Sequence, residues 1–306
     1  MYCGGGGDDD DDGIPFLGEC SLASIDFKLT NPRSLPPSPP FLPLPLSPSQ
    51  WHKRGAVILA GSTDATTWMW SAVSGDCMQV FAGHEDSVTC GSFTANGKQV
   101  VTGSMDSTIR IWAPKTGVCK QTFTLNKADK TGYCHGWHTS GITTLACHPD
   151  ADKPLVLTGS CDGTSRLVHV QSKKMIGTLQ HRREGDLGGH SVEAVGFSNA
   201  HAWAVTAGSA GLANVWDLNT LKVRHELRHE AAIIRAKFID QSPLLATCSV
   251  DQSVKVWDTR SGECVRELLG HHDQVLDLDA VKGGGGAHDL TIVAASDDKT
   301  CRVFRV

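Results

Sequence analysis

The sequence lacks the patterns that mark secreted and membrane-spanning proteins. Its 11 cysteines are odd in number and include no CxxC pair, which favours reduced thiols over a disulfide framework. No apolar run approaches the length of a membrane span, and no secretory leader pattern opens the chain. We therefore expect a protein of the cytoplasm or nucleus with free cysteines and no membrane partner.

The sequence also has none of the short motifs that bind phosphate or carry a catalytic serine. No glycine-rich loop with a lysine follows an expected strand, and no nucleophile elbow is present. The net charge of −5 arises within residues 1–50, so residues 51–306 balance to zero, which argues against direct nucleic-acid binding. We expect no enzyme, no cofactor and no small-molecule ligand.

A repeated hairpin pattern is present, and its clearest copy is ATCSVDQSVKVWD at residues 246–258. Its β-branched and aromatic residues suit two short strands joined by a tight turn. A single hairpin buries too little surface to be stable alone, so it needs copies. Further copies end at Trp70, Trp112, Val168, Trp216 and Phe304.

Dipeptides at regular places sharpen this pattern. Gly83-His84, Gly189-His190 and Gly270-His271 precede hairpins, with Arg228-His229 in the same slot, and Trp216-Asp217 and Trp257-Asp258 end them. The chain thus resembles the WD-repeat family. The resemblance implies an all-β fold, a β-propeller with six recognisable blades of about four strands each.

The ends of the predicted propeller raise the question of ring closure. The last blade begins near Val275 and shows three strands, so a strand from upstream must complete it. Either Ser24–Thr30 closes the ring or the ring is incomplete. Residues 1–50 are acidic at Asp8–Asp12 and proline-rich from residue 31, which predicts a disordered segment, and residues 51–306 form the propeller.

Histidines and aspartates recur within the repeats and invite a catalytic interpretation. The WD-repeat resemblance instead implies a buried network of His, a strand hydroxyl, a turn Asp and Trp. Two sets are complete by position: His84, Thr102, Asp106 and Trp112, and His229, Thr247, Asp251 and Trp257. Because a polar set that repeats with the fold is structural, we expect no catalytic residue here.

One group of residues has the composition of a zinc site: Cys134, His135, His138, Cys147 and His148. Zinc takes four Cys or His ligands in tetrahedral geometry. Alignment of the blades places His138 in the His84 slot and Cys147 in a core position, so both are explained without metal. We expect no metal site.

The loops on the two faces of the predicted ring differ in charge. The upper loops carry Glu85, Asp86, Glu193, Glu230, Asp273 and Asp297, with the apolar Met105 beside them. The lower turns carry Lys98, Lys115, Lys153, Lys173, Lys174, Lys222 and Arg260. We expect the upper residues to bind a basic segment of a protein partner. The alternative is that these charges are simply solvated loops.

A finer resemblance rests on LAGSTDATTWMW, GHEDSVTC, DGTSRLV and SVDQSVKVWD, which are similar to segments of the angio-associated migratory cell protein family. That family includes a dedicated chaperone of a large-subunit ribosomal protein, so the resemblance implies a scaffold in ribosome assembly. Family members carry further repeats before the region matched from Trp51 onward, so we expect this chain to lack the N-terminal blades.

Two alternatives to the chaperone function remain open. Trp257, Asp258 and Arg260 are similar to the WDxR box with which WD-repeat receptors bind the adaptor of a cullin ubiquitin ligase. This similarity implies a substrate receptor of a cullin-RING ligase. The other alternative is a scaffold in signalling or cell migration.

Overall fold

The computed structural model describes residues 50–51, 56–124, 137–181, 190–282 and 290–305. Within these ranges the regular elements are strands, in six antiparallel sheets, which confirms the all-β prediction. In the described part of the chain, no helix is long and apolar enough to cross a membrane.

Each sheet is one blade, numbered here in chain order. Blade one contains β1 (Gln50–Trp51), β2 (Val57–Gly61), β3 (Thr66–Ser71) and β4 (Cys77–Ala82). Blade two contains β5 (Val88–Phe93), β6 (Val100–Ser104), β7 (Ile109–Trp112) and β8 (Cys119–Phe123). Blade three contains β9 (Ile142–Cys147), β10 (Leu155–Ser160), β11 (Thr164–His169) and β12 (Lys174–Gln180).

The second half repeats this plan until the last blade. Blade four contains β13 (Val192–Phe197), β14 (Trp203–Gly208), β15 (Leu212–Asp217) and β16 (Lys222–Arg228). Blade five contains β17 (Ile233–Phe238), β18 (Leu244–Ser249), β19 (Val254–Asp258) and β20 (Glu263–Leu268). Blade six contains β21 (Val275–Lys282), β22 (Leu290–Ser296) and β23 (Cys301–Arg305).

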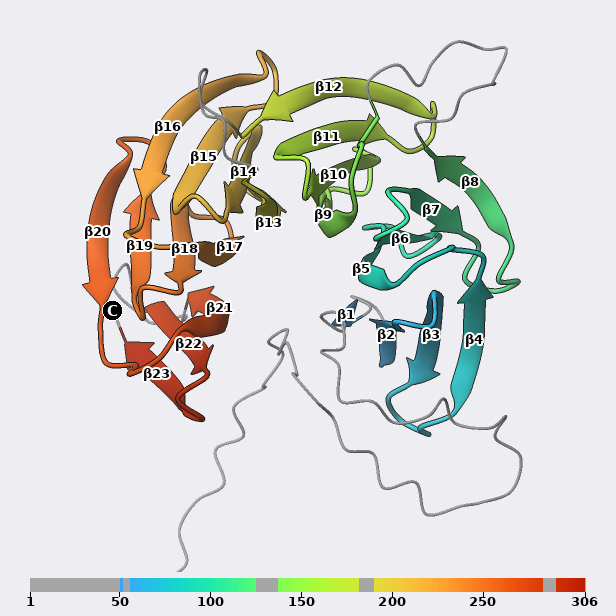
Figure 1. The fold of residues 1–306 in the computed structure, drawn as a ribbon, viewed down its shortest axis with the longest axis horizontal. Coiled ribbons are helices and arrows are strands. Elements are labelled where there is room, and N and C mark those ends of the chain that lie inside the picture. The colour runs from blue at the N-terminus through green and yellow to red at the C-terminus, as the bar shows by residue number, and fades with distance from the viewer. Residues whose placement is uncertain (1–49, 52–55, 125–136, 182–189, 283–289, 306) are drawn as a thin grey trace, which may run out of the picture.

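The blades stand around a common centre (Figure 1). The first strand of each blade is innermost, and the fourth strands β4, β8, β12, β16 and β20 lie at the periphery. This arrangement confirms the propeller prediction of six blades, with three strands in the last. The sequence shows no innermost strand for blade one, but the structure has one. β1 pairs with β2 over only two residues, too few to read as a strand.

The packing between blades explains the burial pattern. The second strands β10 and β18 are buried almost throughout, because blades cover both of their faces. The outer strand β20 is exposed over most of its length. Between blades one and two, Leu59, Met69 and Phe81 pack against Val100 and Trp112. Side chains from adjacent blades thus form a series of cores, each of which joins one sheet to the next.

Ion pairs join the innermost strands of the last two blades. Arg235 Nε on β17 lies 3.3 Å from Asp277 Oδ1 on β21, and Lys237 Nζ lies 2.5 Å from Asp279 Oδ1. The segment Ser24–Thr30, expected to complete blade six, lies outside the described residues. Closure by that segment therefore stays a prediction.

Candidate functional site

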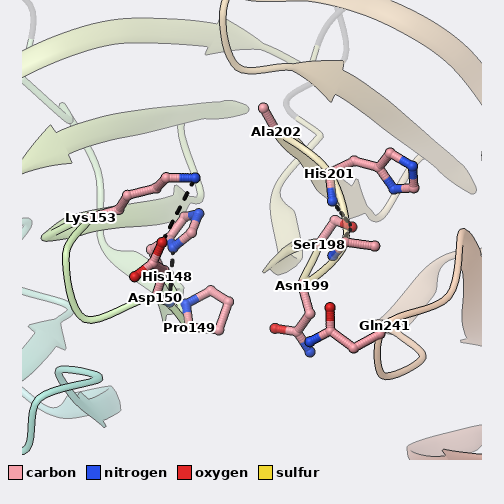
Figure 2. A pocket seen from close by; sticks show the side chains of 10 residues that line it. His148, Pro149, Asp150, Lys153, Ser198, Asn199, His201, Ala202 and Gln241 are labelled. Carbon is pink, nitrogen blue, oxygen red and sulfur yellow. Dashed lines mark hydrogen bonds and ion pairs between the residues drawn. The ribbon is translucent and has the colours of Figure 1, made fainter.

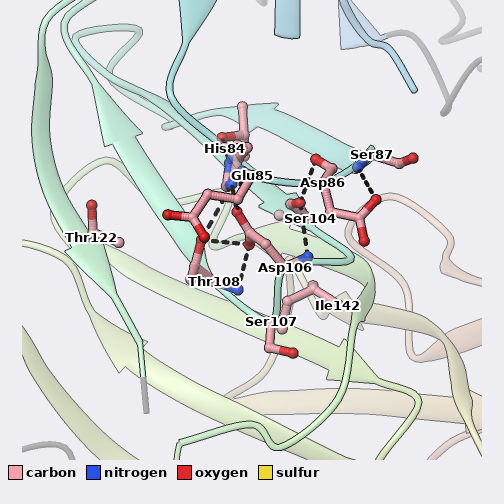
Figure 3. A network of polar contacts seen from close by, with 12 residues as sticks. His84, Glu85, Asp86, Ser87, Ser104, Asp106, Ser107, Thr108, Thr122 and Ile142 are labelled. Carbon is pink, nitrogen blue, oxygen red and sulfur yellow. Dashed lines mark hydrogen bonds and ion pairs between the residues drawn. The ribbon is translucent and has the colours of Figure 1, made fainter. Parts of the chain in front are cut away.

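The site rests on a hydrogen-bonded network that fixes the upper turns, and in blade two this network is complete. Figure 3 shows its end at His84 and Asp106. Trp112 Nε1 donates to Thr102 Oγ1 at 2.8 Å, and Thr102 Oγ1 lies 2.8 Å from His84 Nε2. His84 Nδ1 lies 2.8 Å from Asp106 Oδ2. The side chains of His84 and Asp106 are only 1% and 7% exposed. The sequence-predicted set is confirmed.

Blade five repeats the same geometry, as predicted. Trp257 Nε1 donates to Thr247 Oγ1 at 2.8 Å, and Thr247 Oγ1 lies 2.7 Å from His229 Nε2. His229 Nδ1 lies 2.8 Å from Asp251 Oδ2. Burial lowers the pKa of His229, although Asp251 acts in the opposite direction. A neutral imidazole follows, with Nδ1–H donating to the carboxylate and Nε2 accepting from the threonine hydroxyl.

The carboxylate at the end of the network is ionised. Burial acts to raise the pKa of Asp106, but hydrogen bonds from His84, Glu85 and Thr108 outweigh it and hold that pKa well below its usual range. Both ring nitrogens of His84 are occupied, and its carboxylate partner accepts several donors. The network therefore has no base free for catalysis, and its role is to fix the turn.

Other blades hold parts of the network. In blade three, His138 contacts Asp162 at 2.9 Å and Thr158 at 2.8 Å, although Val168 replaces the Trp. In blade six, His271 Nδ1 lies 2.9 Å from Asp298 Oδ2. Its Nε2 is buried with no hydrogen-bond partner, because Ala294 takes the place of the hydroxyl.

The histidine of blade four is His181, and the assignment of Gly189-His190 to this slot is wrong. His181 Nδ1 lies 3.0 Å from Thr206 Oγ1, which also accepts from Trp216 Nε1 at 2.9 Å. The useful signal is position, because His181 directly follows β12 just as His229 directly follows β16. The GH dipeptide misleads here, because His84, His229 and His271 follow their outer strands by one to three residues, whereas His190 lies ten residues after the end of β12.

The networks hold exposed carboxylates in place on the upper face. This face consists of the turns between second and third strands and the connections from a fourth strand to the next blade. The backbone N–H of Glu85 donates to Asp106 Oδ2 at 3.0 Å, and that of Glu230 donates to Asp251 Oδ2 at 3.1 Å. The side chains of both glutamates are exposed (Figure 3 shows Glu85).

Serines on the second strands anchor the remaining acidic residues. Ser104 Oγ donates to the carbonyl of Asp86 at 2.8 Å, and Ser296 Oγ donates to that of Asp273 at 3.0 Å. Both aspartates are exposed, as is Asp297 in the next turn. Hydrogen bonds that recur from blade to blade thus determine where these carboxylates stand.

A family model and several relatives match this chain. The model described as WD domain, G-beta repeat matches residues 75–113, 130–168, 221–258 and 262–305. The chain belongs to the WD-repeat family. It is 31% identical over 268 residues to the angio-associated migratory cell proteins of dog and human, covering 84% of this chain and 57% of each relative. An uncharacterised WD repeat-containing protein of Schizosaccharomyces pombe is 30% identical over 165 residues, 54% of this chain and 38% of that protein.

The WD-repeat chain spans little more than half the length of the angio-associated migratory cell proteins. WD-repeat proteins generally act as scaffolds that bind other proteins, and the matched family is not a catalytic one. The sequence-level resemblance to both families is therefore confirmed.

Two of the residues predicted for the upper face differ from the exposed acidic residues in their environment or in their chemistry. Glu193 is predicted in a loop, but it is the second residue of β13, where the register shifts between Val192 and Ala194. It is half-buried and accepts a hydrogen bond from Ser191 Oγ. Met105 stands in the turn after β6 with 40% of its surface exposed, as expected for an apolar contact.

One acidic residue of the upper face, Asp64, was not predicted as a site residue from the sequence. Asp64 is exposed in the turn after β2, and its equivalence to Asp106 in the repeat is the signal for it. Among the described upper turns of this WD-repeat protein, Lys299 is the single Lys or Arg. The upper face is acidic where it is described, and the lysines and arginines of residues 125–136 and 182–189 lie outside that part.

The lower face is mixed in charge. Its turns join first to second strands and third to fourth strands. They carry five of the predicted cations, Lys98, Lys115, Lys153, Lys173 and Arg260, whereas Lys174 begins β12 and Lys222 begins β16. Asp76, Asp150, Asp152 and Asp240 stand in the same turns, and Glu263 begins β20. The predicted contrast between the faces therefore comes from the acidic upper face, because the lower face is not correspondingly basic.

The candidate adaptor box is largely engaged within the WD-repeat fold. Trp257 is 6% exposed and donates to Thr247, so its indole is unavailable as a surface contact. Arg260 Nη2 lies 2.7 Å from Asp258 Oδ2, and Arg260 Nε lies 3.1 Å from Asp258 Oδ1. Arg260 itself remains on the surface, with 65% of its side chain exposed.

The candidate zinc ligands do not act as a group in the described residues. His138 uses both ring nitrogens in the network of blade three, as the repeat alignment predicts. Cys147 packs against the core cluster between blades two and three. His148 stands in a lower turn, after β9, and Cys134 and His135 lie outside the described residues.

Proposed function

We propose that this WD-repeat protein is a non-enzymatic scaffold whose upper face binds a basic segment of a protein partner. The observation that carries the proposal is the set of exposed carboxylates in turns fixed from below: Asp64, Glu85, Asp86, Glu230, Asp273 and Asp297. Lys299 is the single cation in the described upper turns. A surface of one sign attracts segments of the other sign and excludes like-charged ones.

Affinity must come from several contacts acting together. An exposed ion pair contributes only about 0.2–1 kcal/mol, so a single carboxylate cannot hold a partner. Because the turns are preorganised by buried hydrogen bonds, binding costs little ordering of the backbone. Met105 adds apolar surface next to Glu85 and Asp86, where an aliphatic stem of Lys or Arg can pack.

The partner class we propose is a ribosomal protein, which the chain would bind in the cytoplasm as a dedicated chaperone. Two arguments support it. The upper face calls for a partner rich in Lys and Arg, and ribosomal proteins have that composition. The second argument is the resemblance to the angio-associated migratory cell protein family. The ribosomal-protein chaperone is what that resemblance implies.

The test reverses charge on the upper face and compares it with the lower face. The variant carries Glu85→Lys, Asp86→Lys and Asp273→Lys, and the control carries Lys98→Glu, Lys115→Glu and Lys174→Glu. Partners are captured from cell extract with each protein and identified by mass spectrometry. Association of the main basic partner is then timed at several salt concentrations. We expect the upper variant to slow association and to flatten its salt dependence, with the control unchanged.

The fold should survive in both variants, because none of these side chains belongs to a buried network. Loss of capture in the lower-face control, with normal capture by the upper variant, would contradict the proposal. A cullin adaptor as the main partner would then favour the ligase receptor acting through Arg260. Signalling proteins as the main partners would favour the migration scaffold.

A further inference from the structure

The innermost strands of blades two to six share an irregularity at their second residue. In β5, β9, β13, β17 and β21 this residue falls where the register with the second strand of the blade shifts, so each strand carries a β-bulge. The bulged residues are Thr89, Thr143, Glu193, Ile234 and Leu276. A bulge redirects the side chain that it carries, and a bulge that recurs from blade to blade is a feature of the fold.

In blades two and three the bulged side chain binds the backbone of the next blade. Thr89 Oγ1 donates to the carbonyl of Ile142 at 2.5 Å, and Thr143 Oγ1 donates in the same way to the first residue of β13. Blades five and six carry Ile234 and Leu276 at this position, whose side chains cannot form hydrogen bonds. The bulges of these two blades therefore present apolar side chains, where those of blades two, three and four present polar ones.

Ile234 and Leu276 stand on neighbouring strands. β17 and β21 lie side by side at the inner edge of blades five and six (Figure 1). The residues that follow the two bulges directly, Arg235 and Asp277, form an ion pair with Nε 3.3 Å from Oδ1. Leu276 is 37% exposed, and Ile234 is partly exposed. Two apolar side chains are thus accessible on adjacent strands, at the upper ends where these strands begin.

Val250 adds to this apolar surface from the turn after β18. Its backbone N–H donates to the carbonyl of Ala232, directly before β17, at 2.9 Å. The same bond recurs in blade four, where the N–H of Ser209 donates to the carbonyl of Ser191 at 3.0 Å, so this position of the turn accepts serine. Val250 is partly exposed. We call Ile234, Val250 and Leu276 together the apolar mouth.

Exposed carboxylates border the apolar mouth. Glu230 and Asp273 stand in the connections that lead into β17 and β21, and Asp297 stands in the turn after β22. Gln274 Nε2 donates to Asp297 Oδ2 at 2.5 Å, and the N–H of Asp297 donates to the carbonyl of Gln274 at 3.1 Å, so Asp297 is held over the start of β21. Lys299 in the same turn offsets only one of the three negative charges. An apolar surface with this border is complementary to an apolar side chain that has cationic neighbours.

We propose that the apolar mouth anchors one bulky apolar residue of the partner's basic segment, while Lys or Arg on either side of that residue pairs with the bordering carboxylates. The inference rests on the upper-face binding proposed above and adds the residue that sets the register of the segment. Burial of a leucine or phenylalanine side chain contributes more than an exposed ion pair does. The mouth therefore selects among basic segments that the carboxylates alone would bind equally.

The lower face offers a different environment to such a residue. Its cavity of about 330 Å³ is lined by turns of blades three, four and five, and the walls include Asn199, His201 and Gln241 (Figure 2). An apolar side chain placed there would take these polar groups out of water without giving them partners. We therefore expect the apolar residue of the segment to be selected on the upper face.

The test measures binding of labelled peptides to the full chain by fluorescence polarisation. Two peptides carry six lysines and differ only in their central residue, which is leucine in one and serine in the other. A third peptide keeps the leucine and carries glutamates in place of the lysines. We expect the leucine peptide to bind about tenfold more tightly than the serine peptide, and the glutamate peptide not to bind.

Leu276→Ser should remove the preference for leucine and leave the affinity for the serine peptide unchanged. The matched control is Val265→Ser, which removes a valine that is 43% exposed on the outer strand β20 and should keep the preference. Val250→Ser is the second variant, and it decides the test if thermal melting shows that Leu276→Ser is unstable.

The outcomes separate this inference from the proposed function. Saturable binding of both lysine peptides with equal affinity would overturn the apolar anchor and leave the upper-face proposal standing. A preference that survives in both mouth variants, or that Val265→Ser removes equally, would also overturn the anchor. No saturable binding of either lysine peptide would contradict the proposed function and the anchor together.

Discussion

Replacement of Asp251 by alanine should destabilise the protein far more than the same change at Asp64. Asp251 accepts from His229 Nδ1 at 2.8 Å, from the N–H groups of Glu230 at 3.1 Å and Ser253 at 3.0 Å, and from Ser253 Oγ at 2.6 Å. Asp64 is exposed, and its contacts are with Ser62 and Thr66 in its own turn.

The magnitude follows from what each change leaves without a partner. Asp251→Ala leaves His229 Nδ1–H buried, since the His229 side chain is 0% exposed, with only a 3.2 Å contact to Ser253 Oγ. A buried donor without a partner costs about 1–3 kcal/mol, and the lost turn bonds add to this. We expect about 3 kcal/mol in all. For Asp64→Ala water replaces the lost acceptor, so we expect less than about 1 kcal/mol.

Thermal unfolding followed by circular dichroism measures the difference. For a domain of this size, about 1 kcal/mol shifts Tm by roughly 2–4 °C, so Asp251→Ala should lower Tm by roughly 6–12 °C. Asp64→Ala should change Tm by no more than about 4 °C. Equal losses in the two variants would refute the reasoning, because they would show that the networks do not determine the stability of their blades.

Three further predictions concern individual blades. Burial lowers the pKa of His181 to about 4, an effect to which His190 adds and which a hydrogen bond with the Leu212 backbone opposes. The unfolded chain therefore binds a proton first as pH falls, and stability should drop by up to about 3 kcal/mol between about pH 6.5 and 4. Urea titrations at several pH values should show this slope, and His181→Gln should flatten it. In blade six, Ala294→Thr combined with Phe304→Trp should complete the network, give His271 Nε2 a partner and raise Tm, whereas Phe304→Trp alone should not. If Ser24–Thr30 completes blade six, deletion of residues 1–35 should lower Tm strongly. Unchanged melting would mean that the ring is either open or closed by another segment.

The fold could be predicted from the sequence because each repeat contains the residues that define its own hairpin. A hairpin ending in Trp112 or Trp257 contains the strand periodicity, the turn Asp and the network Thr within a short window. Interactions of this kind are local or recur at a fixed spacing, so periodicity reveals them. β1 escaped prediction because two residues carry no periodicity, and only its pairing with β2 defines it as a strand.

The site was predicted less completely, for a different reason. Exposed residues in turns such as Glu85 and Asp273 follow from the repeat alignment. The setting of Glu193 does not, because the register shift at the start of β13 moves it from a loop onto a strand. His181 was missed because the dipeptide at residues 189–190 imitates the usual motif. A cavity on the lower face, lined by turns of blades three, four and five, could not be foreseen, since it depends on how three separate segments of the chain lie relative to one another.

The same hydrogen bonds explain why we expect binding residues in this fold on its upper and lower faces and not within the buried networks. The side chains best suited to acid–base chemistry, His229 and Asp251 among them, are largely buried and bonded to one another. A base that is neutral, desolvated and already donating to a carboxylate has no proton transfer left to perform on a ligand. What the network offers instead is a rigid backbone beneath Glu85 and Glu230. Exposed side chains on these turns can differ between WD-repeat proteins without loss of the fold, because the network holds the turn backbone and not the side chains.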